Sequence, residues 1–168
     1  MKKLILILSL SLFFFAKISF AQAIDFDLPD LDGNSVKLSG LLEKGPVFIS
    51  FWATWCIPCK EEMRVMNEIY KKYKDSGFVY VAINRDDVKS VPKVRPYIES
   101  KGYDFIVVFD TDAHVFETFG GQQIPFAVLL NKKGDVLHTY STGYTAGDEI
   151  ELEKDIVKAL SELKSEKK

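Results

Sequence analysis

The hydrophobic positions of this chain change several times between unbroken runs and helical spacing. Apolar runs of about four to eight residues are typical of strands buried on both faces of a sheet. We therefore predict strands at 47–53, 78–83 and 105–109. Apolar residues three and four apart indicate a helix, as at Met63, Met66, Ile69, Tyr70 and Tyr73. The predicted helices are 56–73, 92–100, 113–119 and 147–163.

Two turn segments predict β-hairpins. Asp32-Gly33-Asn34 stands in the middle of residues 24–38, and the turn at 131–134 separates predicted strands at 126–130 and 135–140. Gly and Asn favour the tight turns that join antiparallel strands. Strands that alternate with helices along the chain imply an α/β fold, with a central mixed sheet and helices on both faces.

The first 23 residues have the pattern of a secretory signal peptide. Met1-Lys2-Lys3 precedes an apolar run, and Ala21-Gln22-Ala23 matches an A-x-A cleavage site. Lys17 interrupts the apolar stretch, so we favour a cleaved signal, with an uncleaved N-terminal membrane anchor as the alternative. Residues 24–168 then form one domain, which we expect in the periplasm or on the extracytoplasmic face of the membrane.

The charge balance argues against nucleic acid as a partner. The chain has 22 Lys and Arg against 24 Asp and Glu, a formal net charge of −2. The signal segment holds three of the lysines and no acidic residue, so the remaining chain has a net charge of −5. Nucleic-acid binding needs a basic surface, which this composition does not favour.

The only two cysteines, Cys56 and Cys59, stand between a predicted strand and a predicted helix. Such a C-x-x-C pair is the layout of a dithiol–disulfide exchange site. If the helix begins near Cys56, that sulfur faces unpaired backbone N–H groups and the positive end of the helix dipole, which favour a thiolate. Cys59 lies about one turn further on, close enough for a short local disulfide. We predict that Cys56 is the nucleophile and Cys59 the resolving thiol.

Three other uses of a cysteine pair fit the residues less well. A structural zinc site usually needs four ligands, and the two histidines, His114 and His138, are remote from the pair in sequence. A c-type haem site needs His directly after the second cysteine, where Lys60 stands. A purely structural disulfide normally closes a longer loop. We expect neither a metal ion nor a cofactor.

Residues 51–60, Phe-Trp-Ala-Thr-Trp-Cys-Ile-Pro-Cys-Lys, resemble the active-site segment of thioredoxin-fold proteins. Ile124-Pro125, followed by a strand and a hairpin, resembles the cis-proline loop of that family. The segment 26–38 and the long stretch between Cys59 and Pro125 are closer to one branch, the exported TlpA/ResA-like thiol-disulfide oxidoreductases. The resemblance covers nearly all of residues 24–168.

This resemblance implies a thioredoxin fold with an added N-terminal β-hairpin and an extra helix-strand element between the active-site helix and the cis-proline loop. It also implies reduction of protein disulfides outside the cytoplasm, for example at the haem-attachment cysteines of apocytochrome c. Electrons would come from a membrane thiol carrier. Trp55, Ile124 and Pro125 would bind the substrate, with the backbone of Ile124 pairing with an extended segment. We expect the protein to be a monomer.

One position departs from thioredoxin, which has a buried Asp on the strand before its C-x-x-C. The matching residue here is Ser50, which cannot exchange a proton at neutral pH. TlpA/ResA-like proteins carry a Glu three residues after the second cysteine, and Glu62 stands at that position. A carboxylate there can exchange a proton with Cys59, and its negative charge raises the pKa of that thiol. The alternative, that Lys60-Glu61-Glu62 is an exposed helix face, stays open.

Two other functional classes on this fold need residues that this motif lacks, and a third uses the same two cysteines. A peroxiredoxin needs Thr or Ser three residues before its reactive cysteine, where Ala53 stands. A copper chaperone uses C-x-x-x-C with a distal histidine, and the spacing here is one residue shorter. A disulfide oxidase or isomerase using the same two cysteines is the main alternative, because the reduction potential decides the direction of exchange.

Overall fold

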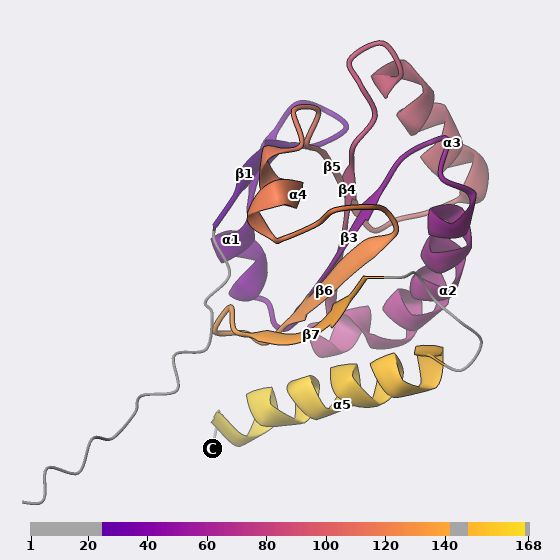
Figure 1. Cartoon of the computed structure of the whole chain (residues 1–168). Coiled ribbons are helices and arrows are strands. Elements are labelled where there is room, and N and C mark those ends of the chain that lie inside the picture. Colours follow the sequence, from indigo (N-terminus) through magenta and orange to yellow (C-terminus); the bar gives the residue numbers. More distant parts are fainter. Residues whose placement is uncertain (1–24, 142–147, 167–168) are drawn as a thin grey trace, which may run out of the picture.

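The computed structural model describes residues 25–141 and 148–166 (Figure 1). Five strands form one sheet in the order β5-β4-β3-β6-β7. β3 pairs with β4, and β4 with β5, in parallel, whereas β6 runs antiparallel to both β3 and β7. The sheet is therefore mixed, as the sequence predicts. The strands are β3 (Val47–Trp52), β4 (Val79–Asn84), β5 (Ile106–Phe109), β6 (Phe126–Leu130) and β7 (Val136–Tyr140).

Helices cover both faces of this sheet (Figure 1). One face packs against α2, α3 and α5, and the other against α1, α4 and the N-terminal hairpin. The hairpin is antiparallel, and a bridge from Asp30 to Val108 joins it to the edge strand β5. These elements are β1 (Asp27–Pro29), β2 (Ser35–Lys37), α1 (Leu38–Leu42), α2 (Ile57–Tyr73), α3 (Val94–Lys101), α4 (His114–Thr118) and α5 (Asp148–Glu166).

The central position of β3 in the sheet explains why its sequence is apolar except at Ser50. Successive side chains of a strand point to opposite faces of the sheet. Phe48 and Trp52 accordingly pack in the cluster under α2 and α5, while Ile49 and Phe51 pack in the cluster under α1 and α4. All six residues of β3 are buried, which an alternating polar pattern would not allow.

The predicted strands and helices are confirmed to within a few residues, and α3 with β5 forms the extra helix-strand element between α2 and the proline loop. The predicted helix 92–100 is split into a 3-10 turn (Val91–Lys93) followed by α3. The helix α1 was missed, and the prediction that the hairpin segment reaches Leu38 is wrong because Leu38 begins α1. This short helix has no side-chain cap, and it is held in place by the buried Leu38 and Leu41. Gly147, the predicted start of the last helix, lies outside the described residues.

The loops that lead into β3 and β4 touch at the end of the sheet opposite the cysteines. A Cβ atom at Gly45 would collide with the carbonyl oxygen of Gly77. Gly77 itself has a φ of 97° and ends the 3-10 turn Lys74–Ser76 after α2. Glycine at both positions therefore lets two backbone segments approach more closely than side chains would permit.

The structure does not test the predicted signal segment 1–23, which lies outside the described residues. Within the described part of the chain, no helix is long and apolar enough to cross a membrane.

Candidate active site

Cys56 and Cys59 form a disulfide where β3 leads into α2. Their Cα atoms are 5.3 Å apart. Cys56 is the N-cap residue of α2, and Pro58 lies in the first turn, where a missing N–H costs little. The prediction that the helix begins beside Cys56 is therefore confirmed.

The backbone at the helix start is directed at the first sulfur. The Cys59 N–H donates a hydrogen bond to Cys56 Sγ, with a donor–acceptor distance of 3.3 Å. Such a donor, together with the positive end of the helix dipole, stabilises a thiolate on Cys56 when the disulfide is reduced. Both residues are buried, with 4% of Cys56 and 1% of Cys59 exposed.

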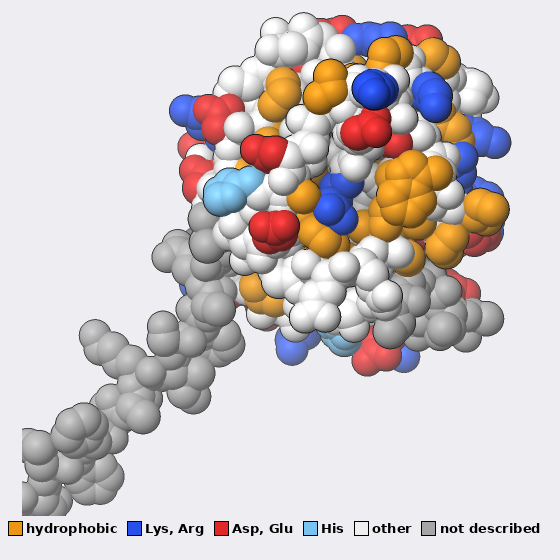
Figure 2. Space-filling model, turned by 45° about the horizontal axis from the view of Figure 1, so that its top comes forward, with side chains coloured by type: hydrophobic (Ala, Val, Ile, Leu, Met, Phe, Trp, Pro, Cys, Tyr) orange, Lys and Arg blue, Asp and Glu red, His pale blue; other side chains and the backbone are white. Residues whose placement is uncertain are grey.

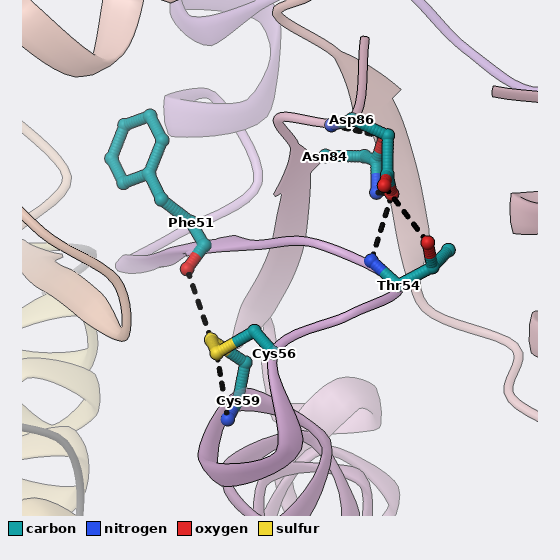
Figure 3. Close-up of a disulfide and its surroundings, with 6 residues drawn as sticks. All are labelled: Phe51, Thr54, Cys56, Cys59, Asn84 and Asp86. Atoms are coloured by element: carbon teal, nitrogen blue, oxygen red, sulfur yellow. Dashed lines mark hydrogen bonds between the residues drawn. A yellow bond between two sulfur atoms is a disulfide. The ribbon is translucent and has the colours of Figure 1, made fainter. Parts of the chain in front are cut away.

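The second sulfur faces the end of β3. Cys59 Sγ lies 3.9 Å from the carbonyl oxygen of Phe51 (Figure 3). Neither sulfur of a disulfide carries a proton, so this is a contact in the oxidised protein. In the reduced protein a Cys59 thiol can donate its proton to the same carbonyl, which favours the neutral form of Cys59.

A buried polar cluster holds the loop that precedes Cys56 (Figure 3). Asp86 accepts hydrogen bonds from the Thr54 N–H and hydroxyl, each at 2.8 Å, and from Asn84 Nδ2 at 2.8 Å. The Asp86 N–H in turn donates to Asn84 Oδ1 at 3.1 Å. Sequence reasoning missed this cluster, although polar residues directly after the buried strand β4 were a signal for it.

Glu62 is buried on α2 rather than exposed. It is 2% exposed and follows Cys59 by three residues on α2, so the two side chains share a helix face. Burial raises the pKa of its carboxyl to about 8. Among the described residues, Glu62 Oε2 has no hydrogen-bond partner. The alternative that residues 60–62 form an exposed face is therefore wrong for Glu62, while its neighbour Glu61 is exposed.

Ser50 occupies the strand position under α2 and pairs with a tyrosine. Its hydroxyl lies 2.9 Å from the Tyr80 hydroxyl, and both residues are buried. Burial raises the pKa of Tyr80 well above its usual value, so this hydroxyl stays protonated at neutral pH. Ser50 and Tyr80 thus satisfy each other. Of the three buried carboxyl groups in the described residues, Glu62, Asp86 and Asp110, only Glu62 lies on α2 with Cys59.

The proline loop reaches the same end of the sheet. The Ile124–Pro125 bond is cis, as the resemblance implies. Pro125 precedes Phe126, which pairs with Phe51 of β3, and Ile124 packs against the cluster that contains both cysteines. Trp55 is 69% exposed beside the disulfide. Figure 2 shows a face of the molecule on which exposed hydrophobic side chains lie among both basic and acidic side chains.

The two histidines lie apart from this site. His114 is exposed at the start of α4, and His138 on β7 lies 3.4 Å from Asp155 of α5. In the described ranges, no group of three or more His, Cys, Asp or Glu residues is placed to hold a metal ion.

A thioredoxin-like sheet, a disulfide at the start of a helix and a cis-proline beside it define a thiol-disulfide exchange site. Comparisons with known proteins agree with this class. The AhpC/TSA family matches residues 21–139. The thiol-disulfide oxidoreductase ResA of Halalkalibacterium halodurans is 35% identical over 136 residues, which cover 79% of this chain and 76% of that protein. ResA of Bacillus subtilis is 38% identical over 117 residues, 70% of this chain and 64% of that protein.

Solved structures give the same result. The crystal structure of a putative thiol:disulfide interchange protein DsbE from Chlorobium tepidum matches with a TM-score of 0.75 and 33% identity. The match covers 83% of this chain and 95% of that one. This chain therefore belongs to the AhpC/TSA family, and within it to the ResA-like thiol-disulfide oxidoreductases.

Proposed function

We propose that this protein is a reductase of protein disulfides that acts outside the cytoplasm through Cys56 and Cys59. The observation that carries the proposal is the environment of the two sulfurs. Cys56 receives a backbone N–H at the start of α2, whereas Cys59 lies deeper, beside a carbonyl oxygen and a helical turn from the buried Glu62. The first environment favours a thiolate and the second a thiol, which is the division of roles that dithiol exchange needs.

The reaction follows from these two environments. The Cys56 thiolate attacks one sulfur of a substrate disulfide, a mixed disulfide forms, and the other substrate sulfur leaves as a thiolate that takes up a proton. Cys59 then loses its proton and attacks Cys56 Sγ. The bond between Cys56 and the substrate breaks, and the second substrate sulfur leaves. Two electrons have passed to the substrate, and the Cys56–Cys59 disulfide remains.

Glu62 is the proposed acceptor of the Cys59 proton. In the disulfide form its pKa of about 8 keeps the carboxyl protonated at neutral pH. When an electron donor opens the disulfide, this proton can pass to the Cys59 sulfur as it leaves. The proton returns to Glu62 when Cys59 attacks the mixed disulfide. One proton thus moves back and forth within the protein, and the negative charge passes to the Glu62 carboxylate instead of staying on the Cys59 sulfur.

The substrate and location extend the same proposal. The pattern of residues 1–23 supports export, and the resemblance to TlpA/ResA-like proteins supports apocytochrome c as a substrate and a membrane thiol carrier as the electron donor. Trp55, which precedes Cys56 in the chain, and Ile124 and Pro125 of the proline loop are the proposed contacts for the substrate polypeptide. The protein would act as a monomer, with the N-terminal segment cleaved or retained as an anchor.

Trapping of mixed disulfides tests the roles of the two cysteines. In Cys59→Ser the attack by Cys56 still occurs, but nothing resolves the product, so mixed disulfides with substrate accumulate. Cys56→Ser should trap nothing, because the remaining thiol is buried and lacks the helix-start N–H. The measurement is non-reducing electrophoresis after incubation with a disulfide peptide. Equal trapping by both variants would overturn the assignment.

The reduction potential tests the direction of the reaction. Equilibration with a series of glutathione buffers should give a potential on the order of −200 mV or lower, nearer to thioredoxin than to a strong periplasmic oxidant. A strongly oxidising potential would instead favour the alternative, a disulfide oxidase or isomerase that uses the same two cysteines.

A further inference from the structure

A groove runs along the surface between α2 and α3 and begins beside the disulfide. It has a volume of about 590 Å³. Its first residue, Ile57, directly follows Cys56 and is 79% exposed. The groove continues along α2 to Lys71, fourteen residues further on, which is about 20 Å along a helix. An extended polypeptide of about six residues would span that length.

The groove is positively charged in a protein whose overall charge is negative. Four cationic side chains line it, Lys60, Arg64, Lys71 and Lys101, against two carboxylates, Glu61 and Glu68. Both carboxylates already have partners. Arg64 Nη2 lies 2.6 Å from Glu61 Oε1, and Lys71 Nζ lies 3.4 Å from Glu68 Oε1.

Two lysines of the groove have no carboxylate partner. Among the residues whose side chains the structure describes, none places a carboxylate oxygen within salt-bridge distance of Lys60 or Lys101. The Lys60 ammonium instead sits 4.9 Å from the centre of the Tyr97 ring. Two positive charges are therefore left for an incoming group, one close to the disulfide and one at the end of α3.

The aromatic residues of the groove add hydrogen-bond donors and apolar contact. Tyr97 and Tyr103 are half-buried, and their ring centroids are 6.4 Å apart. Burial raises the pKa of Tyr97 to about 12, and its hydroxyl donates to the Tyr103 hydroxyl, so the Tyr103 hydroxyl is the one that can donate to a carboxylate or a peptide carbonyl. Tyr97 also packs against Trp52 of β3, with ring centroids 5.5 Å apart. This contact joins the α3 side of the groove to the core.

We propose that the groove between α2 and α3 binds an acidic segment of the substrate polypeptide, about six residues long, next to the cysteine that Cys56 attacks. The inference rests on the proposed function and adds a substrate preference to it. Acidic side chains of the segment would face Lys60 and Lys101, and its apolar side chains would contact Ile57 and the tyrosine rings. Electrostatic attraction of this kind acts mainly on the rate of encounter and weakens as salt is added.

Three disulfide peptides of equal length test the preference. Each contains the same disulfide followed by six residues that are acidic, neutral or basic. The wild-type protein should reduce the acidic peptide with a kcat/KM about 10-fold above that of the basic peptide at low salt. The ratio should approach one at about 1 M salt, where charges are screened within a few ångströms.

Charge reversal in the groove should reverse the order of the peptides. The variant Lys60→Glu/Lys101→Glu should prefer the basic peptide. The matched control, Lys44→Glu/Lys132→Glu, has the same net charge but changes exposed residues at the opposite end of the sheet. It should keep the wild-type preference for the acidic peptide.

Each result decides between distinct conclusions. Equal rates for the acidic and basic peptides with the wild-type protein would overturn the groove proposal and leave the reductase proposal standing. A reversed order in the control as well would show that net charge, not the groove, determines the preference, which also overturns it. If the wild-type protein reduces none of the three peptides, the proposed function fails, and the groove proposal fails with it.

Discussion

Two buried carboxylates near the active-site loop have opposite surroundings. Asp86, at the end of β4, is 0% exposed and accepts three hydrogen bonds from Thr54 and Asn84. Glu62, on α2, is 2% exposed, and its Oε2 accepts none from the described residues. Burial raises the pKa of Glu62 to about 8, so it is mostly protonated at neutral pH.

The contrast separates a structural carboxylate from one that can take part in proton transfer. A buried carboxylate with three donors stabilises the loop that it binds, and its protonation would break those bonds. The Glu62 carboxyl has no donor at Oε2 among the described residues, so its protonation breaks no hydrogen bond there, and the ionised form is the one that burial makes costly.

The largest effect is expected at Asp86. Asp86→Ala should lower the free energy of unfolding by about 3 kcal/mol, because the buried Asn84 amide and the part-buried Thr54 N–H and hydroxyl lose their acceptor. The measurement is urea unfolding followed by fluorescence. Asp87→Ala, at the exposed neighbouring position, should cost less than about 1 kcal/mol. A loss at Asp86 as small as that at Asp87 would contradict the structural role.

The second prediction concerns pH and stability at Glu62. Its pKa is about 8 in the folded disulfide form and about 4.5 when unfolded, so between these values the folded protein holds a proton that the unfolded chain has lost. The stability that protonated Glu62 contributes to the folded protein is complete below about pH 4.5, and it is lost as the pH rises through 8. Between pH 5 and 8, wild type should lose about 3 kcal/mol relative to Glu62→Gln. Parallel pH profiles of unfolding for the two proteins would refute the raised pKa.

The third prediction concerns the rate of exchange. Glu62→Gln should slow reduction of a disulfide peptide about 10- to 100-fold, because Cys59 loses its proton acceptor. The variant should also lower the pKa of the Cys59 thiol, since it removes a neighbouring negative charge. Thiol alkylation against pH, together with peptide reduction, measures both effects. A variant that titrates and turns over like wild type would show that another group moves the proton.

The smallest effect is expected at Glu61, one position before Glu62. Its carboxylate is exposed and bound by Arg64, on the side of α2 away from the sheet. Glu61→Gln should change the pKa of Cys59 by less than about 0.3, because solvent screens an exposed charge. The same alkylation series tests this value. A shift as large as that of Glu62→Gln would mean that burial does not distinguish the two glutamates.

Much of this architecture could be predicted from the sequence because the decisive signals are local. The apolar run of β3, the spacing of Met63 and Met66, and the turn at Gly33 each lie within one element. The cysteine pair could also be recognised from the sequence, since Cys56 and Cys59 are three residues apart. Their motif also predicted where α2 begins.

The remaining features depend on contacts between distant parts of the chain. Thr54 and Asp86 are 32 residues apart and meet only because β3 and β4 pair in parallel with Trp52 opposite Asn84. The groove depends on how α2 and α3 lie against each other, which periodicity does not determine. Lys60-Glu61-Glu62 has two adjacent glutamates, and only the packed helix shows which one is buried. The roles of Cys56, Cys59 and Glu62 in turnover stay predictions.

The close approach of Gly45 and Gly77 has a consequence for redesign. It lies at the end of the β3–β4 pair that is remote from the disulfide. The six paired residues of each strand span about 20 Å between the two ends. A methyl group at position 45 would push the two loops apart and change the lengthwise alignment of β3 against β4. β3 leads directly to Cys56, and β4 ends at the residues that hold Thr54. An alanine at this remote position would therefore displace Cys56. The close approach of the two glycine backbones thus helps to position the nucleophile.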